Sequence, residues 1–114
     1  MPKRYFRDAA TFRLIVTGYG SCIATDRITV DGAPIGFMYR ETPDHDTDSG
    51  WRFFAGDETD EYANNPERLA IYDVNTIANY DASVTPYLDK PFGSAWIRDG
   101  AEFIEDSGFQ FSES

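Results

Sequence analysis

The chain has 114 residues, close to the commonest size of a single domain. Nine Phe, seven Tyr and two Trp supply enough apolar surface for one core, which argues against intrinsic disorder. The formal net charge is −10 and the isoelectric point is about 4.3. A charge of this sign disfavours nucleic acid and anionic membranes as partners, and it favours association with basic proteins.

The single cysteine, Cys22, rules out a disulfide bond within the chain and indicates a reducing compartment. The charged residues at the start of the chain are not followed by the apolar segment of a signal peptide. No apolar run approaches the roughly 18 residues that a membrane-spanning helix needs. We therefore expect a cytoplasmic protein.

The first part of the chain is predicted to form short strands joined by glycine-containing turns. The β-branched run at 13–18 ends in such a turn, and a second run at 22–30 ends at Asp31-Gly32. We expect 22–30 to form a hairpin with the strand at 35–41. Alternation along that strand directs one bulky set toward the core: Ile35, Phe37 and Tyr39.

A polar loop is expected at 42–50, because turn-forming and acidic residues dominate this segment. Strand character returns at 51–56. The acidic residues that follow tolerate a helix and show no strand periodicity, so we expect a short helix at 57–65. Asn65-Pro66 then ends it or begins a new turn.

The next segments predict a strand at 69–72 and two short helices. Asp73 is a plausible N-cap for a helix at 74–80, whose apolar residues recur at helical spacing. Ser83 is expected to cap a second short helix that ends near Leu88, with its proline in the tolerated first turn.

The end of the chain predicts a hairpin of 94–98 with 102–105, joined across Asp99-Gly100. The expected fold is α+β, a single domain with a mainly antiparallel sheet and two or three short helices. We assign three regions: an N-terminal segment and first strand at 1–19, the main body of the same domain at 20–106, and a frayed tail at 107–114. The predicted core comprises Leu14, Val16, Ile23, Ile35, Phe37, Trp51, Phe53, Ile71, Val74, Ile77, Leu88, Trp96 and Phe103.

No catalytic, metal-binding or cofactor-binding site is predicted. The aspartates at 44, 46 and 48 resemble the start of a calcium loop, but Ser49 stands where glycine is needed and Ala55 where a bidentate glutamate is needed. His45 is the only histidine and lacks the companions that zinc requires. Cys22 has no sequence-adjacent base, so a buried structural thiol is the favoured interpretation.

Acidic and aromatic residues interleave in one stretch, from Glu41 to Glu61, which holds eight of the twenty acidic residues. Trp51 and Phe53 are expected to face the core, whereas Phe54 and Tyr62 are better surface candidates. Aromatic side chains within a charged rim are typical of protein interfaces. The predicted partner-binding residues are Asp44, Asp46, Asp48, Phe54, Asp57, Glu58, Asp60, Glu61 and Tyr62.

Three motifs carry a resemblance to a known family: MYRE at 38–41, DSGWRFFAGDETDEY at 48–62 and IYDVNTI at 71–77. With them, about residues 20–106 resemble a bacterial family of small acidic proteins that is grouped with the immunity proteins of polymorphic toxin systems. The resemblance implies a non-catalytic protein that neutralises a cognate toxin by direct binding, inside the cell that makes it. A basic toxin would match the acidic surface. Two alternatives remain open, a binding module with another ligand and an unrecognised enzyme.

Overall fold

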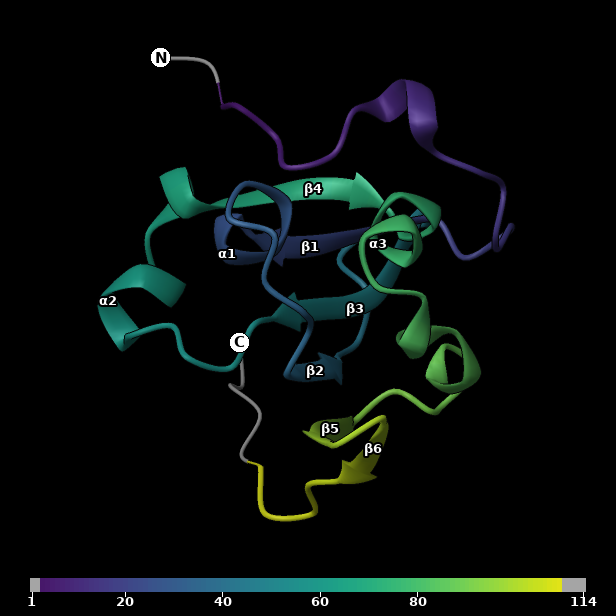
Figure 1. Ribbon diagram of the computed structural model, residues 1–114. Helices are drawn as coiled ribbons and strands as arrows, with labels where there is room; N and C mark the ends of the chain where they lie inside the picture. Colours follow the sequence, from purple (N-terminus) through teal and green to yellow (C-terminus); the bar gives the residue numbers. More distant parts are fainter. Residues whose placement is uncertain (1–2, 110–114) are drawn as a thin grey trace.

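A computed structural model describes residues 3–109 and has the expected α+β architecture, with a six-stranded mixed sheet and short helices. The strand order is β4-β1-β3-β2-β5-β6, and Figure 1 shows these strands from β4 at the top to β5 and β6 at the bottom. Only β1 and β3 pair in parallel. The strands are β1 Ser21–Thr25, β2 Phe37–Arg40, β3 Asp48–Phe54, β4 Leu69–Asp73, β5 Ser94–Asp99 and β6 Glu102–Glu105.

The helices are short, as predicted. Asp73 caps α3, because its carboxylate accepts a hydrogen bond from the Asn75 amide at 2.8 Å. The helix expected at 83–88 is a 3-10 helix, and Asp81 rather than Ser83 caps it. The helical elements are η1 Ala9–Thr11, α1 Asp26–Thr29, α2 Asp60–Ala63, η2 Pro66–Arg68, α3 Val74–Tyr80 and η3 Ala82–Tyr87.

The strand predicted at 13–18 is wrong. This segment belongs to an N-terminal arm, drawn in purple and blue in Figure 1, that has no place in the sheet. Side-chain amides take the place of a neighbouring strand: Arg13 N donates to Asn79 Oδ1 at 2.8 Å, and Val16 N donates to Asn75 Oδ1 at 3.0 Å. Leu14 is 77% exposed, so its placement in the core is also wrong.

The hairpin predicted between 22–30 and 35–41 is wrong as well. β1 ends at Thr25, and its neighbours are β3 and β4 rather than β2. The second half of the run forms α1, where Ile28 is fully buried and the helix contacts α3. Burial against the core therefore overrides the strand preference of these β-branched residues.

The core lies on one face of the sheet, where α1, α3 and η3 pack. Trp51 is fully buried there, and its Nε1 donates to the backbone oxygen of Leu88 at 3.1 Å. Val16 is half-buried and packs against this cluster. Eight of the predicted core residues are confirmed as buried: Ile35, Trp51, Phe53, Val74, Ile77, Leu88, Trp96 and Phe103.

The opposite face of the sheet, here called the outer face, also carries apolar side chains. In β2, Met38 is the fully buried residue, so Phe37 and Tyr39 project to the other side. Ile23 and Ile71 are paired across β1 and β4 on the outer face, and Ile71 is 67% exposed. The core predictions for Phe37, Ile23 and Ile71 are therefore wrong.

The tail predicted to fray, 107–114, is described as far as Phe109, and residues 110–114 lie outside the described part of the chain. Phe109 packs on the outer face, with ring centroids 5.2 Å from Phe37 and 5.0 Å from Tyr39. Phe109 therefore adds a further aromatic side chain to that face, beside Phe37 and Tyr39.

Candidate functional site

A groove of about 470 Å³ opens on the outer face beside β2 and β3. Phe37, Tyr39 and Phe54 form its floor, and Phe109 contributes to its wall. The strand register explains the floor, since Phe37 lies directly opposite Phe54. The rings of Tyr39 and Phe54 are nearly parallel, with an interplanar angle of 14° and centroids 5.8 Å apart. The floor is thus formed by three aromatic rings in mutual contact.

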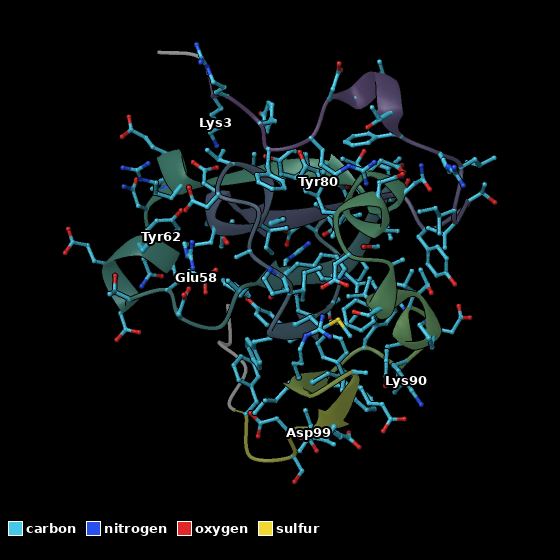
Figure 2. All side chains as sticks on the ribbon, viewed as in Figure 1. Lys3, Glu58, Tyr62, Tyr80, Lys90 and Asp99 are labelled. Atoms are coloured by element: carbon cyan, nitrogen blue, oxygen red, sulfur yellow. The ribbon has the colours of Figure 1, made fainter. Side chains whose placement is uncertain are left out.

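The rim of the groove is acidic on the side of α2. Glu58 and Asp60 line it together with Ala63 and Asn64, and no lysine or arginine belongs to the described lining. Figure 2 shows Glu58 and Tyr62 near α2, Lys90 beside the green helical segment that precedes β5, and Asp99 at the β5–β6 turn. The groove therefore combines an apolar floor with a negatively charged edge.

Glu58 has a structural role in addition to its charge. Its Oε2 accepts hydrogen bonds from Thr25 Oγ1 at 2.6 Å and from the Ala55 amide at 2.8 Å, and its Oε1 accepts one from the Gly56 amide at 2.9 Å. These bonds tie the turn after β3 to the end of β1. The carboxylate consequently fixes the edge of the groove.

The other three acidic residues near the groove, Asp57, Asp60 and Glu61, differ in whether their carboxylates already form an ion pair. Asp57 forms a two-point ion pair with Arg27, with nitrogen–oxygen distances of 3.0 and 2.7 Å, and these hydrogen bonds lower the pKa of Asp57. Asp60 and Glu61 are exposed in the first turn of α2 and form no ion pair with another residue of 3–109. Asp60 and Glu61 are therefore the carboxylates that a partner meets without competition.

Tyr62 is half-buried on α2. Its ring lies under the guanidinium of Arg68, 5.7 Å from Cζ to the ring centroid, and burial raises the pKa of its hydroxyl. The amide of Tyr62 donates to Thr59 Oγ1 at 3.1 Å, which caps α2. Tyr62 stands next to the groove on the same short helix rather than in its lining.

Asp44, Asp46 and Asp48, here called the first acidic cluster, lie at the opposite end of β3, a seven-residue strand that spans about 20 Å. Asp44 and Asp46 are exposed there, but Asp48 is only 8% exposed. Asp48 makes a two-point ion pair with the buried Arg52, at 2.9 and 2.8 Å, and Glu41 binds the same guanidinium at 2.6 Å. The hydrogen bonds from Arg52 hold the pKa of Asp48 well below its usual range.

The segment 42–50 was expected to be a solvated loop, but Asp48 is the buried first residue of β3. Its carboxylate is therefore not presented to solvent. The two acidic clusters are separate in space, with β3 between them.

Cys22 is buried, as the sequence indicated, and burial raises the pKa of its thiol. His45 is exposed and its Nδ1 lies 3.0 Å from Thr47 Oγ1. Among residues 3–109, no group of three or more His, Cys, Asp or Glu side chains could hold a metal ion. No helix in this part of the chain is long and apolar enough to cross a lipid bilayer.

The floor of the groove was missed at the sequence level, although Phe54 was assigned to the surface. The alternation along β2 does place Phe37 and Tyr39 on a shared face. The sequence gives little indication that this is the outer face, because Met38 on the other side is apolar too. Pairing β2 with β3 as a hairpin would have placed Phe37 beside Phe54.

Comparison with known proteins identifies a family. The family model of the immunity protein Imm33 domain matches residues 22–107, from β1 to just beyond β6, and so includes the acidic rim and the β2 and β3 floor of the groove. No curated protein and no solved structure gives a significant match. The match agrees with the resemblance seen in the sequence motifs. The chain belongs to the Imm33 family of immunity protein domains.

Proposed function

We propose that the chain neutralises a cognate toxin by binding it directly and without catalysis, through the groove and the acidic residues beside it. We call this region the groove surface: Phe37, Tyr39, Phe54, Asp57, Glu58, Asp60, Glu61, Tyr62 and Phe109. The family supports an immunity role in general. The observation that carries the proposal is the aromatic floor of the groove directly beside exposed carboxylates. Apolar aromatic centres with polar rims are typical of protein interfaces.

Charge supports a basic partner. The chain carries a net charge of −10, and the exposed Asp60 and Glu61 add a local negative potential next to the groove. Electrostatic steering of this kind raises association rates by about 10- to 1,000-fold at low ionic strength. A basic toxin would therefore bind quickly and with a strong dependence on salt.

The first acidic cluster belongs at the periphery of the same interface. A standard interface buries about 800 Å² on each partner, which corresponds to a patch about 30 Å across. Such a patch, centred on the middle of β3 rather than on the groove, covers the length of the strand and reaches the loop that holds Asp44 and Asp46. Asp48 contributes indirectly, because its ion pair with Arg52 holds the start of β3 and the adjoining loop.

The test begins with affinity capture, using the chain as bait in an extract of its native organism and identifying the bound protein. Association kinetics are then measured at low and high salt for Asp60→Lys/Glu61→Lys. The matched control is Asp99→Lys/Glu102→Lys, which makes the same charge change on exposed residues at the β5–β6 turn that do not line the groove.

We expect the first pair of substitutions to slow association about tenfold at low salt and to reduce its salt dependence. The control pair should have a much smaller effect. Equal effects of the two pairs would leave only a general charge effect, and unchanged kinetics for both would place the interface elsewhere. Either result contradicts the proposal.

A further inference from the structure

The geometry of the groove points to the side chain that it receives: we infer that an arginine of the protein partner lies on the floor formed by Tyr39 and Phe54, with its guanidinium against Asp60. This inference rests on the proposed function, because the arginine belongs to the protein that the groove surface binds. It adds the chemistry of the central contact.

The floor suits a planar cation. Tyr39 and Phe54 have nearly parallel, stacked rings, and Phe37 extends the apolar area with its centroid 6.0 Å from each of them. A guanidinium stacks on such faces through cation–π attraction and is more weakly hydrated than an ammonium group. The methylene groups of an arginine would lie along Phe37.

The rim supplies the opposite charge. Asp60 lines the groove and is exposed, whereas the oxygens of Glu58 already accept three hydrogen bonds from Thr25, Ala55 and Gly56. Glu58 therefore contributes negative potential, and Asp60 offers free lone pairs for a two-point contact. An aspartate carboxylate matches the fork of the guanidinium, which a lysine ammonium does not reproduce.

The groove has no cation of its own among its described lining residues. The nearest candidate by strand register is Arg52, opposite Tyr39, and it is neutralised by Asp48 and Glu41. A positive group brought by a partner would therefore meet no local repulsion from the lining. This makes the charge of the site complementary to arginine.

The same arrangement occurs elsewhere within this fold. The guanidinium of Arg98 lies over the ring of Phe103, 4.6 Å from Cζ to the centroid, and its Nη2 is 2.6 Å from the Asp81 carboxylate. Aromatic ring, guanidinium and aspartate are thus combined where the chain supplies all three. At the groove it supplies the rings and the aspartate.

The test uses the full chain labelled with ¹⁵N and three small probes: N-acetyl-arginine amide, its neutral isostere N-acetyl-citrulline amide, and N-acetyl-lysine amide with a free side-chain amine. Amide shifts are followed during titration into the millimolar range. We expect saturable shifts from the arginine probe at the amides that frame the groove, which are those of Phe54, Gly56, Asp60, Ala63 and Asn64. Binding of the citrulline probe should be at least about tenfold weaker, because it lacks the charge.

Variants separate the groove from general charge. Asp60→Asn should weaken the arginine probe about fivefold to tenfold, whereas Asp99→Asn should leave it unchanged. The lysine probe should bind more weakly than the arginine probe. Equal shifts from arginine and citrulline, shifts spread over the acidic surface, or no shifts at all would overturn the inference. Groove shifts that appear on concentrating the protein alone would assign the groove to a second copy and would overturn it too.

The two proposals fail in different ways. If the captured partner depends on Asp60 and Glu61 but the arginine probe does not bind the groove, only the arginine assignment is wrong. If the captured partner is insensitive to Asp60→Lys/Glu61→Lys, the proposed function is wrong regardless of the probes. Replacing the partner's arginines singly by glutamine then identifies the contact: one replacement should weaken binding to the native chain about tenfold but have little effect on binding to Asp60→Asn.

Discussion

The two faces of the sheet are both rich in aromatic residues, but those on one face are buried under helices and those on the other line a groove. On the core face, Trp51 and Phe53 are fully buried beneath α3 and η3, with ring centroids 5.9 Å apart. On the outer face, Tyr39 and Phe54 stack in a similar way but line an open groove beside acidic residues. Aromatic content alone therefore does not assign a side chain to the core. The assignment depends on which face the helices cover.

The outer face also differs at its centre, where it buries charge. Arg52 is 2% exposed and binds Asp48 and Glu41, while the apolar groups of this face lie on either side of it. Burial of charge is favourable only where the partners and hydrogen bonds are complete. This ion pair network is therefore the part of the outer face whose stability contribution resembles that of a core.

The comparison is tested most strongly by removing one aromatic side chain from each face. Trp51→Ala should lower the free energy of unfolding by about 3 to 5 kcal/mol, because it leaves a cavity and removes one of the two hydrogen bonds that the Leu88 oxygen accepts. Phe54→Ala should cost only about 1 to 2 kcal/mol, since this side chain is half-buried. Urea denaturation measures both. Equal costs would mean that the groove is part of the core.

Breaking the buried ion pair network should have the next largest effect. Arg52→Met should lower the free energy of unfolding by about 3 kcal/mol, because it leaves Asp48 buried without its counter-ion. Arg27→Met removes the partner of the exposed Asp57 and should cost much less than Arg52→Met, because water screens this pair. Denaturation of the two variants under the same conditions compares them. Similar losses would show that burial does not distinguish the pairs.

Acid should reveal the same network. The pKa of Asp48 is lowered in the folded chain, so its ionised form stabilises the fold at pH values above the ordinary aspartate pKa of about 3.9. That contribution is lost as the pH falls below about 4 toward the lowered folded value. We expect Asp48→Asn to be less stable than the native chain at pH 7 and to show a shallower acid transition, as measured by thermal unfolding. An identical pH profile would contradict this role.

Glu58 and Glu61 offer a smaller and better matched test at the groove rim. Glu58→Gln keeps the shape but replaces one acceptor oxygen by an NH₂ donor, so at least one of the three hydrogen bonds is lost and we expect a cost of about 1 to 2 kcal/mol. Glu61→Gln should change the free energy of unfolding by less than about 0.5 kcal/mol. Chemical denaturation gives both values. A neutral Glu58→Gln would mean that the turn after β3 holds without its carboxylate.

The sequence predicted much of the fold where local signals and tertiary packing agree. Asp73 before a helical pattern and Asp99-Gly100 between two strands led to a correct helix and a correct final hairpin. Prediction failed where distant side chains decide the structure. The side-chain amides of Asn75 and Asn79 bind the backbone of the N-terminal arm, so this segment does not join the sheet as a strand. No local sequence pattern indicates these contacts.

The same reasoning explains the outcome at the candidate site. The acidic cluster was visible as composition, but the ion pair of Asp57 with Arg27 and the burial of Asp48 depend on partners brought close by folding. Whether Phe37 is buried depends on which face of the sheet is covered by α3 and η3. Of the acidic residues predicted to bind a partner, Asp46, Asp60 and Glu61 are exposed and form no ion pair with another residue of 3–109.

The last comparison concerns isoleucine, where the exposed position should show one of the smallest effects. Ile71→Thr should change the free energy of unfolding by less than about 0.5 kcal/mol, because the side chain is largely exposed and threonine keeps the β-branch that suits an edge strand. Ile28→Thr, at a fully buried position on α1, should cost about 2 to 3 kcal/mol through a lost methyl group and a buried hydroxyl. Thermal and urea unfolding measure both variants. A large loss for Ile71→Thr would mean that the β4 side of the outer face is covered in solution, which would extend the buried part of the molecule beyond the helix-covered face.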